Sequence, residues 1–141
     1  MINYNLHSWE FLCENTNKIM IFTVKELAAI HNLAKVMVDA DGKIEGKEAV
    51  LAALELTKLS NGIDSDSIVK MAETMEPAKA FEVVKNMTTD EKKYVSGFLA
   101  AISVVDGNVA PQELAMWKAI SALGNFPAIS FEEALRFWDT H

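Results

Sequence analysis

Carboxylate side chains gather in one short stretch of the chain, residues 38–48, which reads VDADGKIEGKE. Four acidic residues fall within ten positions there, namely Asp39, Asp41, Glu45 and Glu48. Carboxylate oxygens are the ligands that hard divalent cations such as Ca²⁺ and Mg²⁺ prefer. The stretch is therefore a candidate site for a divalent cation, provided that the elements around it bring its side chains together.

The acidic stretch recurs in altered form at residues 105–113, VDGNVAPQE. The two Asp-Gly pairs lie 106 − 41 = 65 positions apart. The same spacing relates further pairs: Gly42 and Gly107, Ile44 and Val109, Glu48 and Glu113, Thr23 and Thr88, and Glu26 and Glu91. So many matches at one spacing indicate an internal duplication of a helix, a sharp turn and a second helix.

Residue types at the two turns predict how each helix ends and the next begins. Gly42 and Gly107 follow long helical patterns, and glycine enters the left-handed region without a Cβ penalty. Glu48 and Glu113 fall at the third position of the next helix, where a carboxylate accepts hydrogen bonds from free backbone N–H groups. Pro111 suits the first helical position. We therefore expect two similar turns, each followed by a helix that a glutamate caps.

These acidic residues allow two interpretations, which the sequence leaves open. In the first, Asp41 and Asp106 brace the turns while Glu48 and Glu113 only cap helices. In the second, a cation site is formed by the acidic residues of the first copy, joined by those of the second if the turns are neighbours: Asp39, Asp41, Glu45, Glu48, Asp106 and Glu113. Neighbouring lysines and the few acids of the second copy favour the first interpretation.

The calcium-binding EF-hand loop is an alternative for the first copy. Five residues fall at its loop positions 3, 5, 6, 8 and 12, namely Asp39, Asp41, Gly42, Ile44 and Glu48. Position 1 requires an acidic ligand, but Met37 occupies it, and the second copy has Ile102 and Val104 at positions 1 and 3. A cation that needs six to eight oxygens would lose its anchoring ligand, so the pattern disfavours an EF-hand.

A helix that runs into Asp-Gly-x-[Ile/Val]-x-x-x-Glu, twice, resembles the TerB-like family. This is the all-helical domain of tellurite-resistance proteins, and it is related to the N-terminal region of a membrane-anchored J-domain co-chaperone. The resemblance covers residues 23–124. The chain departs from the family at Glu45 and Ala110, where a small polar cap is usual. The resemblance implies a non-catalytic intracellular interaction module linked to tellurite or envelope stress.

Composition limits the classes of protein to which the chain belongs. Its 141 residues, 50% of them hydrophobic and 23% charged, suit one globular domain. A net charge of −7 with scattered basic residues argues against nucleic-acid binding. Cys13 is the only cysteine, which excludes an internal disulfide and favours a reducing compartment. No run approaches the ~20 apolar residues of a membrane span. We expect a cytoplasmic protein without membrane insertion.

Helical periodicity and capping boxes predict an all-α domain of about seven to eight helices. The boxes lie at residues 23–26, 88–91 and 130–133. We divide the chain into an N-terminal extension (1–22), repeat one (23–60), an insert of short helices (61–87), repeat two (88–124) and a C-terminal helix (125–141). Residues 46–60 carry Val50, Leu51, Leu54 and Leu59 as their apolar positions. Gly97 within a helix predicts a neighbouring helix that approaches closely.

No catalytic motif is present: the sequence has no Walker loop, no Gly-x-Ser-x-Gly, no Cys-x-x-Cys and no dinucleotide fingerprint. We therefore expect no enzyme, no cofactor other than a divalent cation, and an unidentified protein partner. The alternative function is a divalent-cation sensor that uses the acidic stretch from Asp39 to Glu48. Aromatic residues at both ends of the chain, Trp9 and Phe137 among them, leave self-association open.

Overall fold

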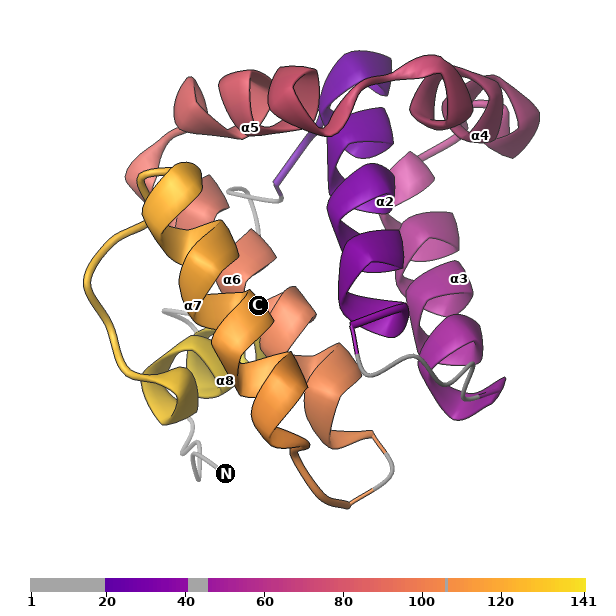
Figure 1. Ribbon diagram of the computed structural model, residues 1–141. Coiled ribbons are helices and arrows are strands. Elements are labelled where there is room, and N and C mark those ends of the chain that lie inside the picture. The colour runs from indigo at the N-terminus through magenta and orange to yellow at the C-terminus, as the bar shows by residue number, and fades with distance from the viewer. Residues whose placement is uncertain (1–19, 41–45, 106) are drawn as a thin grey trace, which may run out of the picture.

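The structure is a computed structural model that describes residues 20–40, 46–105 and 107–141. Every element in the described part of the chain is a helix (Figure 1). This confirms the all-α class. The helices, with their bounds, are α2 (Val24–Val38), α3 (Gly46–Ser60), α4 (Ser65–Thr74), α5 (Pro77–Lys85), α6 (Thr89–Val104), α7 (Pro111–Leu123) and α8 (Phe131–Asp139).

Helices α2 and α6 form the centre of the molecule. Every residue of α6 from Tyr94 to Ser103 is buried, and α2 buries both faces along most of its length. Each begins with a capping box: Thr23 with Glu26, and Thr88 with Glu91, in which side chain and backbone exchange hydrogen bonds of 2.8–3.2 Å. A helix buried all round needs neighbours on every side, and the other helices supply them.

The remaining helices surround this central pair in a repeated order. Helix α2 contacts α3, α4 and α5, while α6 contacts α7 and α8, and α2 and α6 contact each other (Figure 1). Helix α3 also reaches α6, and α7 reaches α2. The two halves of the chain are therefore packed into one core.

The packing of α4 and α8 extends the resemblance between the two halves by one helix. Helix α4 packs on α2 as α8 packs on α6. Their N-caps, Asp64 and Ser130, each accept a hydrogen bond from a backbone N–H of the first turn. Ile68 and Ala134, four residues further on, are both buried. By this packing each half is a unit of three helices, and α5 connects the two.

The close approach expected at Gly97 is present, and α8 makes it. A Cβ atom at position 97 would overlap the backbone oxygen of Ala134 and lie 2.5 Å from the Cβ of Trp138. The equivalent position of α2 holds Asn32, whose side-chain amide donates to the carbonyl oxygens of Met75, at 2.9 Å, and Ala72, at 3.3 Å. The same position joins the first and third helices in both repeats, by close backbone packing in one and by hydrogen bonds in the other.

The first helix of each hairpin ends before the residue that directly precedes the glycine. Helix α2 ends at Val38 with Asp39 as its C-cap, and α6 ends at Val104. Gly42 lies outside the described residues. Gly107 has φ +95° and donates its N–H to the carbonyl of Val104 at 2.9 Å. The expectation of a left-handed glycine is thus confirmed in the second copy, although the helix has already ended.

Replacing Gly107 with alanine should destabilise the protein through backbone conformation alone. No atom lies within 4 Å of where a Cβ would be built, but the φ of +95° is strained for an L side chain. The expected loss is about 1–2 kcal/mol of unfolding free energy in urea denaturation. Gly46→Ala is the matched control, because Gly46 is equally uncrowded and lies in a helix, where alanine is preferred. Equal effects of the two changes would contradict this explanation.

Candidate functional site

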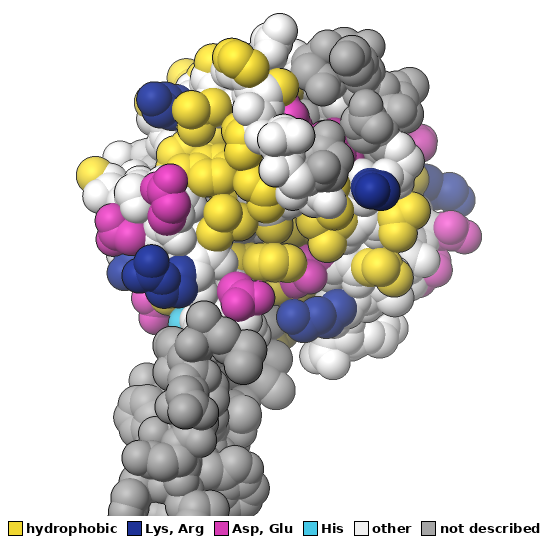
Figure 2. Space-filling model, turned by 90° about the horizontal axis from the view of Figure 1, so that it is seen from below, with side chains coloured by type: hydrophobic (Ala, Val, Ile, Leu, Met, Phe, Trp, Pro, Cys, Tyr) yellow, Lys and Arg dark blue, Asp and Glu magenta, His cyan; other side chains and the backbone are white. Residues whose placement is uncertain are grey.

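The ends of the helices that flank both turns lie at the same end of the molecule. The C-terminal ends of α2 and α6 and the N-terminal ends of α3 and α7 are at the bottom of Figure 1. Figure 2 shows this end directly, with hydrophobic side chains across its middle and charged side chains around them. The described parts of both hairpins are therefore at one end of the molecule.

The predicted site residues fall into three groups at this end. Glu48 and Glu113 are buried, with 0% and 1% of their surface exposed, at the third positions of α3 and α7. Asp39 is exposed at the C-cap of α2. Asp41, Glu45 and Asp106 lie outside the described residues. The described residues contain no group of three acidic, histidine or cysteine side chains placed to hold a metal ion.

Glu113 is buried because it caps the N-terminus of α7. Its carboxylate accepts a hydrogen bond from the backbone N–H of Ala110 at 3.3 Å, and Pro111 opens the helix as expected. A carboxylate in the first turn also faces the positive end of the helix dipole. Neither Glu113 nor Glu48 is without a partner. The capping role predicted for Glu113 is confirmed. At position 1 of the EF-hand alternative, Met37 is fully buried in the core.

A second buried polar cluster, not predicted from the sequence, joins the two repeats. The Tyr94 hydroxyl of α6 donates a hydrogen bond to the Glu55 carboxylate of α3. Both residues are buried, at 3% and 6% exposed, and the Lys58 ammonium lies 3.6 Å from the carboxylate. A sequence signal did exist: Glu55 follows Glu48 by seven residues, which is about two helical turns. The two acids therefore share one face of α3.

The environment of Tyr94 keeps its hydroxyl protonated. Burial raises the pKa of Tyr94 above its ordinary value, and the hydrogen bond to Glu55 and the charge of that carboxylate raise it further. Trp138 acts in the opposite direction. A phenol held neutral beside a carboxylate is a hydrogen-bond donor and not a base. The cluster therefore works as a structural bond between α3 and α6.

Helix α3 turns its two acids inward and much of its apolar surface outward. At about 100° per residue, positions 50 and 54 lie roughly 200–240° around the helix from position 48, while position 55 lies close to it. Val50 is accordingly 57% exposed and Leu54 64% exposed. Two of the four apolar positions named for residues 46–60 therefore face solvent. Leu56 and Leu59 are buried, and Leu51 is half-buried.

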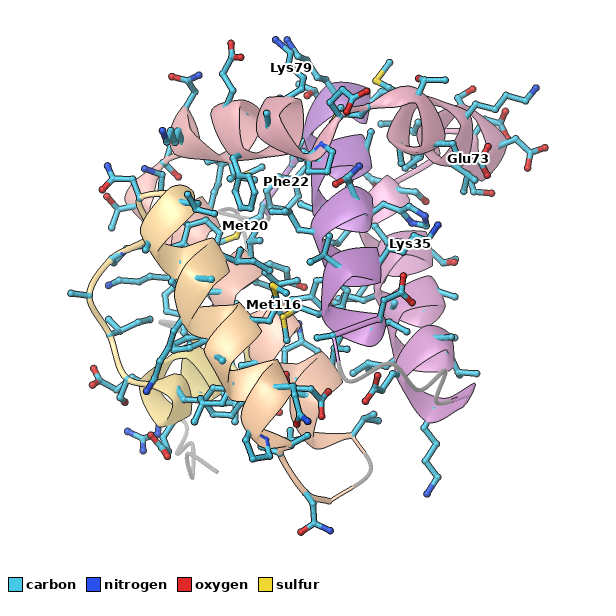
Figure 3. The ribbon with its side chains drawn as sticks, in the orientation of Figure 1. Met20, Phe22, Lys35, Glu73, Lys79 and Met116 are labelled. Carbon is cyan, nitrogen blue, oxygen red and sulfur yellow. The ribbon has the colours of Figure 1, made fainter. Side chains whose placement is uncertain are left out.

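His31 on α2 faces the α4 side of the molecule. Burial lowers its pKa, the nearby Lys35 lowers it further, and Glu73 of α4 raises it. Figure 3 shows Lys35 and Glu73 on that side, whereas Met20, Phe22 and Met116 lie in the middle of the molecule. The Nδ1 atom of His31 is buried and accepts no hydrogen bond from the described residues. The histidine is thus a half-buried structural residue.

Helix α8 carries a partly covered aromatic residue and a shallow depression. Phe137, one of the terminal aromatic residues that left self-association open, is half-buried. It stacks on the His141 ring at 3.9 Å between centroids and has the Lys93 ammonium 5.7 Å from its ring. Beside it, a shallow depression of about 230 Å³ is lined by Leu135, Arg136, Trp138 and Asp139. His141 and Lys93 therefore cover part of Phe137 within the chain. The segment containing Trp9 lies outside the described residues.

Removing the Tyr94 hydroxyl should cost stability because a buried carboxylate loses its donor. Tyr94→Phe is expected to lower the unfolding free energy by about 1.5–3 kcal/mol, the range for a hydrogen bond to a charged group. In a Glu55→Gln background the same change should cost less, about 0.5–1.5 kcal/mol, because the bond is then neutral. Equal costs in both backgrounds, measured by urea denaturation, would show that the pair is not coupled.

The same pair has a pH dependence with a definite sign. Below pH ~10 the tyrosine is protonated in both the folded and the unfolded state, so the contribution of its raised pKa is fully present. Above that pH the unfolded chain loses the proton while the folded chain keeps it. The stability difference between the native protein and Tyr94→Phe should therefore shrink as the pH rises through the alkaline range.

In the described part of the chain, no helix is long and apolar enough to cross a bilayer.

No family model matches the chain, and no curated protein matches it. Among solved structures, the chain is similar to the crystal structure of PG1108, a protein of unknown function from Porphyromonas gingivalis W83. The two share 35% identity with a TM-score of 0.73, over 86% of this chain and 92% of that one. The chain therefore belongs to the same protein family as PG1108 of Porphyromonas gingivalis.

Proposed function

We propose that the chain is a non-catalytic interaction module that binds another protein through the outer face of α3. The observation that carries this proposal is the exposure of Val50 and Leu54, which lie one helical turn apart. Large apolar side chains grouped on one helix face are a feature of protein-binding surfaces. The inward-facing Glu48 and Glu55 make this exposure a fixed feature of the fold, because α3 cannot rotate without exposing them.

The paired Asp-Gly turns support a TerB-like assignment and, through it, a role in tellurite or envelope stress. The support is the resemblance of the motif together with an all-helical fold of two related halves. The extension of the duplication to three helices is consistent with it. On this proposal the turns serve the architecture, and the outer face of α3 serves the partner.

A cation sensor remains the second candidate because the helix ends that flank the two turns lie at one end of the molecule. Asp39 is exposed there, beside the start of the stretch 41–45. The buried Glu48 and Glu113 would have to move, or give up their present contacts, to bind an ion. This cost favours the interaction module over the sensor.

Loss of the exposed apolar side chains should remove function without unfolding the protein. In the organism that encodes the chain, Val50→Asp combined with Leu54→Asp should fail to complement a deletion strain under tellurite or envelope stress. Leu123→Asp is the matched control, because Leu123 on α7 is 56% exposed and lies outside α3. Circular dichroism and thermal melts establish that both variants fold. Full complementation by the α3 variant would overturn the proposed function.

Calorimetric titration separates the two candidates. With Ca²⁺, Mg²⁺ and Mn²⁺ at millimolar concentration, we expect no saturable heat, because the carboxylates at 48 and 113 are buried and engaged. Saturable heat that Asp39→Asn or Asp41→Asn removes would establish the sensor instead. Both substitutions conserve side-chain size and leave the capping glutamates in place.

A further inference from the structure

The outer face of α3 has an unusual charge pattern for this protein. The chain has 20 acidic and 13 basic residues, yet both acids of α3 are buried, Glu48 at 0% and Glu55 at 6% exposed. The exposed charged residues of α3 are two lysines, Lys47 and Lys58. The exposed residues of the helix are Gly46, Lys47, Ala49, Val50, Ala53, Leu54, Thr57 and Lys58. A short apolar strip is thus bounded by a positive charge near each end, on a protein that is negative overall.

The geometry of the strip suits a helix as its ligand. From position 46 to position 57 the strip spans about three turns, or roughly 16 Å. Val50 and Leu54 project from it, and the small side chains of Ala49, Ala53 and Thr57 run alongside. Small residues beside larger ones let a second helix approach closely and pack its own apolar side chains between them. Among the described elements, α3 contacts chiefly α2 and α6, on its other side.

A second copy of the chain does not suit this face. Pairing α3 with itself about a two-fold axis would place Lys47 near Lys58 of the other copy if the helices run antiparallel. If they run parallel, each lysine would lie near its own counterpart. Like charges so placed are unfavourable, and the exposed face of α3 has no acid to offset them. An anionic lipid surface is disfavoured too, because the two lysines of this face contribute only about 2 kcal/mol of attraction to it.

We propose that the outer face of α3 docks an acidic amphipathic helix of a partner protein. The apolar side of that helix covers Val50 and Leu54, and its carboxylates lie at Lys47 and Lys58. This inference rests on the proposed function and adds the chemistry of the partner. Lys58 already lies near the buried Glu55, at 3.6 Å, so Lys47 is the lysine free to respond most to an added negative charge.

The test uses two synthetic helical peptides of about 18 residues, or five turns. Both carry the same leucine stripe, one with glutamates on the remaining faces and one with lysines. Fluorescence anisotropy should show the glutamate peptide binding at least about tenfold more tightly than the lysine peptide, with affinity that falls as salt is raised. Leu54→Asp should weaken the glutamate peptide at least about tenfold. Lys47→Glu should weaken it and strengthen the lysine peptide.

Leu123→Asp is again the control and should leave both affinities unchanged. Equal binding of the two peptides, no binding of either, or equal loss in the Leu123 variant would each overturn the proposal. So would a dimer in sedimentation that Leu54→Asp dissociates, which would assign the face to a second copy. Binding to phosphatidylserine vesicles that Lys47→Glu abolishes would assign it to a membrane.

The two proposals fail separately. If the glutamate peptide does not bind but the Val50 and Leu54 variant still fails to complement, the α3 face is functional and only the acidic-helix partner is wrong. If that variant complements fully, the interaction module itself is wrong.

Discussion

The structure depends on the burial of two helices, α2 and α6, against each other and against everything around them. An uninterrupted run of ten residues in α6 is buried, and α2 has core residues on nearly every side. A helix of this kind is stable only when other elements cover it all round. Helices α3, α4 and α5 cover α2, while α7 and α8 cover α6. Each central helix therefore has its own set of covering helices.

Polar groups fix the geometry that apolar burial leaves undetermined. The Tyr94 hydroxyl and the Glu55 carboxylate join α6 to α3 across the boundary between the repeats. The capping contact of Glu113 fixes the start of α7. A buried carboxylate is costly unless it is partnered, so each such group tolerates few orientations of its helix. The rotation of α3 is therefore set by its acids, and the exposure of Val50 and Leu54 follows from it.

The first and third helices of each repeat are held together by different contacts in the two repeats. At one equivalent position, Asn32 hydrogen-bonds the C-terminal end of α4. At the other, Gly97 lets α8 approach so closely that a methyl group would not fit. The contact between the first and third helices is therefore polar in one repeat and steric in the other. This difference hid the relation between α4 and α8 from a comparison of residues alone.

Much of this protein is determined by local signals that the sequence shows directly. Capping boxes start three helices, at Thr23, Thr88 and Ser130. In the second hairpin, the turn contains the left-handed Gly107 and the second helix begins at Pro111. These features depend on neighbouring residues only, so the helical class and the two hairpins could be predicted. The rotation of α3 could not, because that helix has apolar residues on both sides and its periodicity fits either. Only contact with Tyr94 on α6, distant in sequence, decides that the acids face inward and that the apolar strip faces solvent.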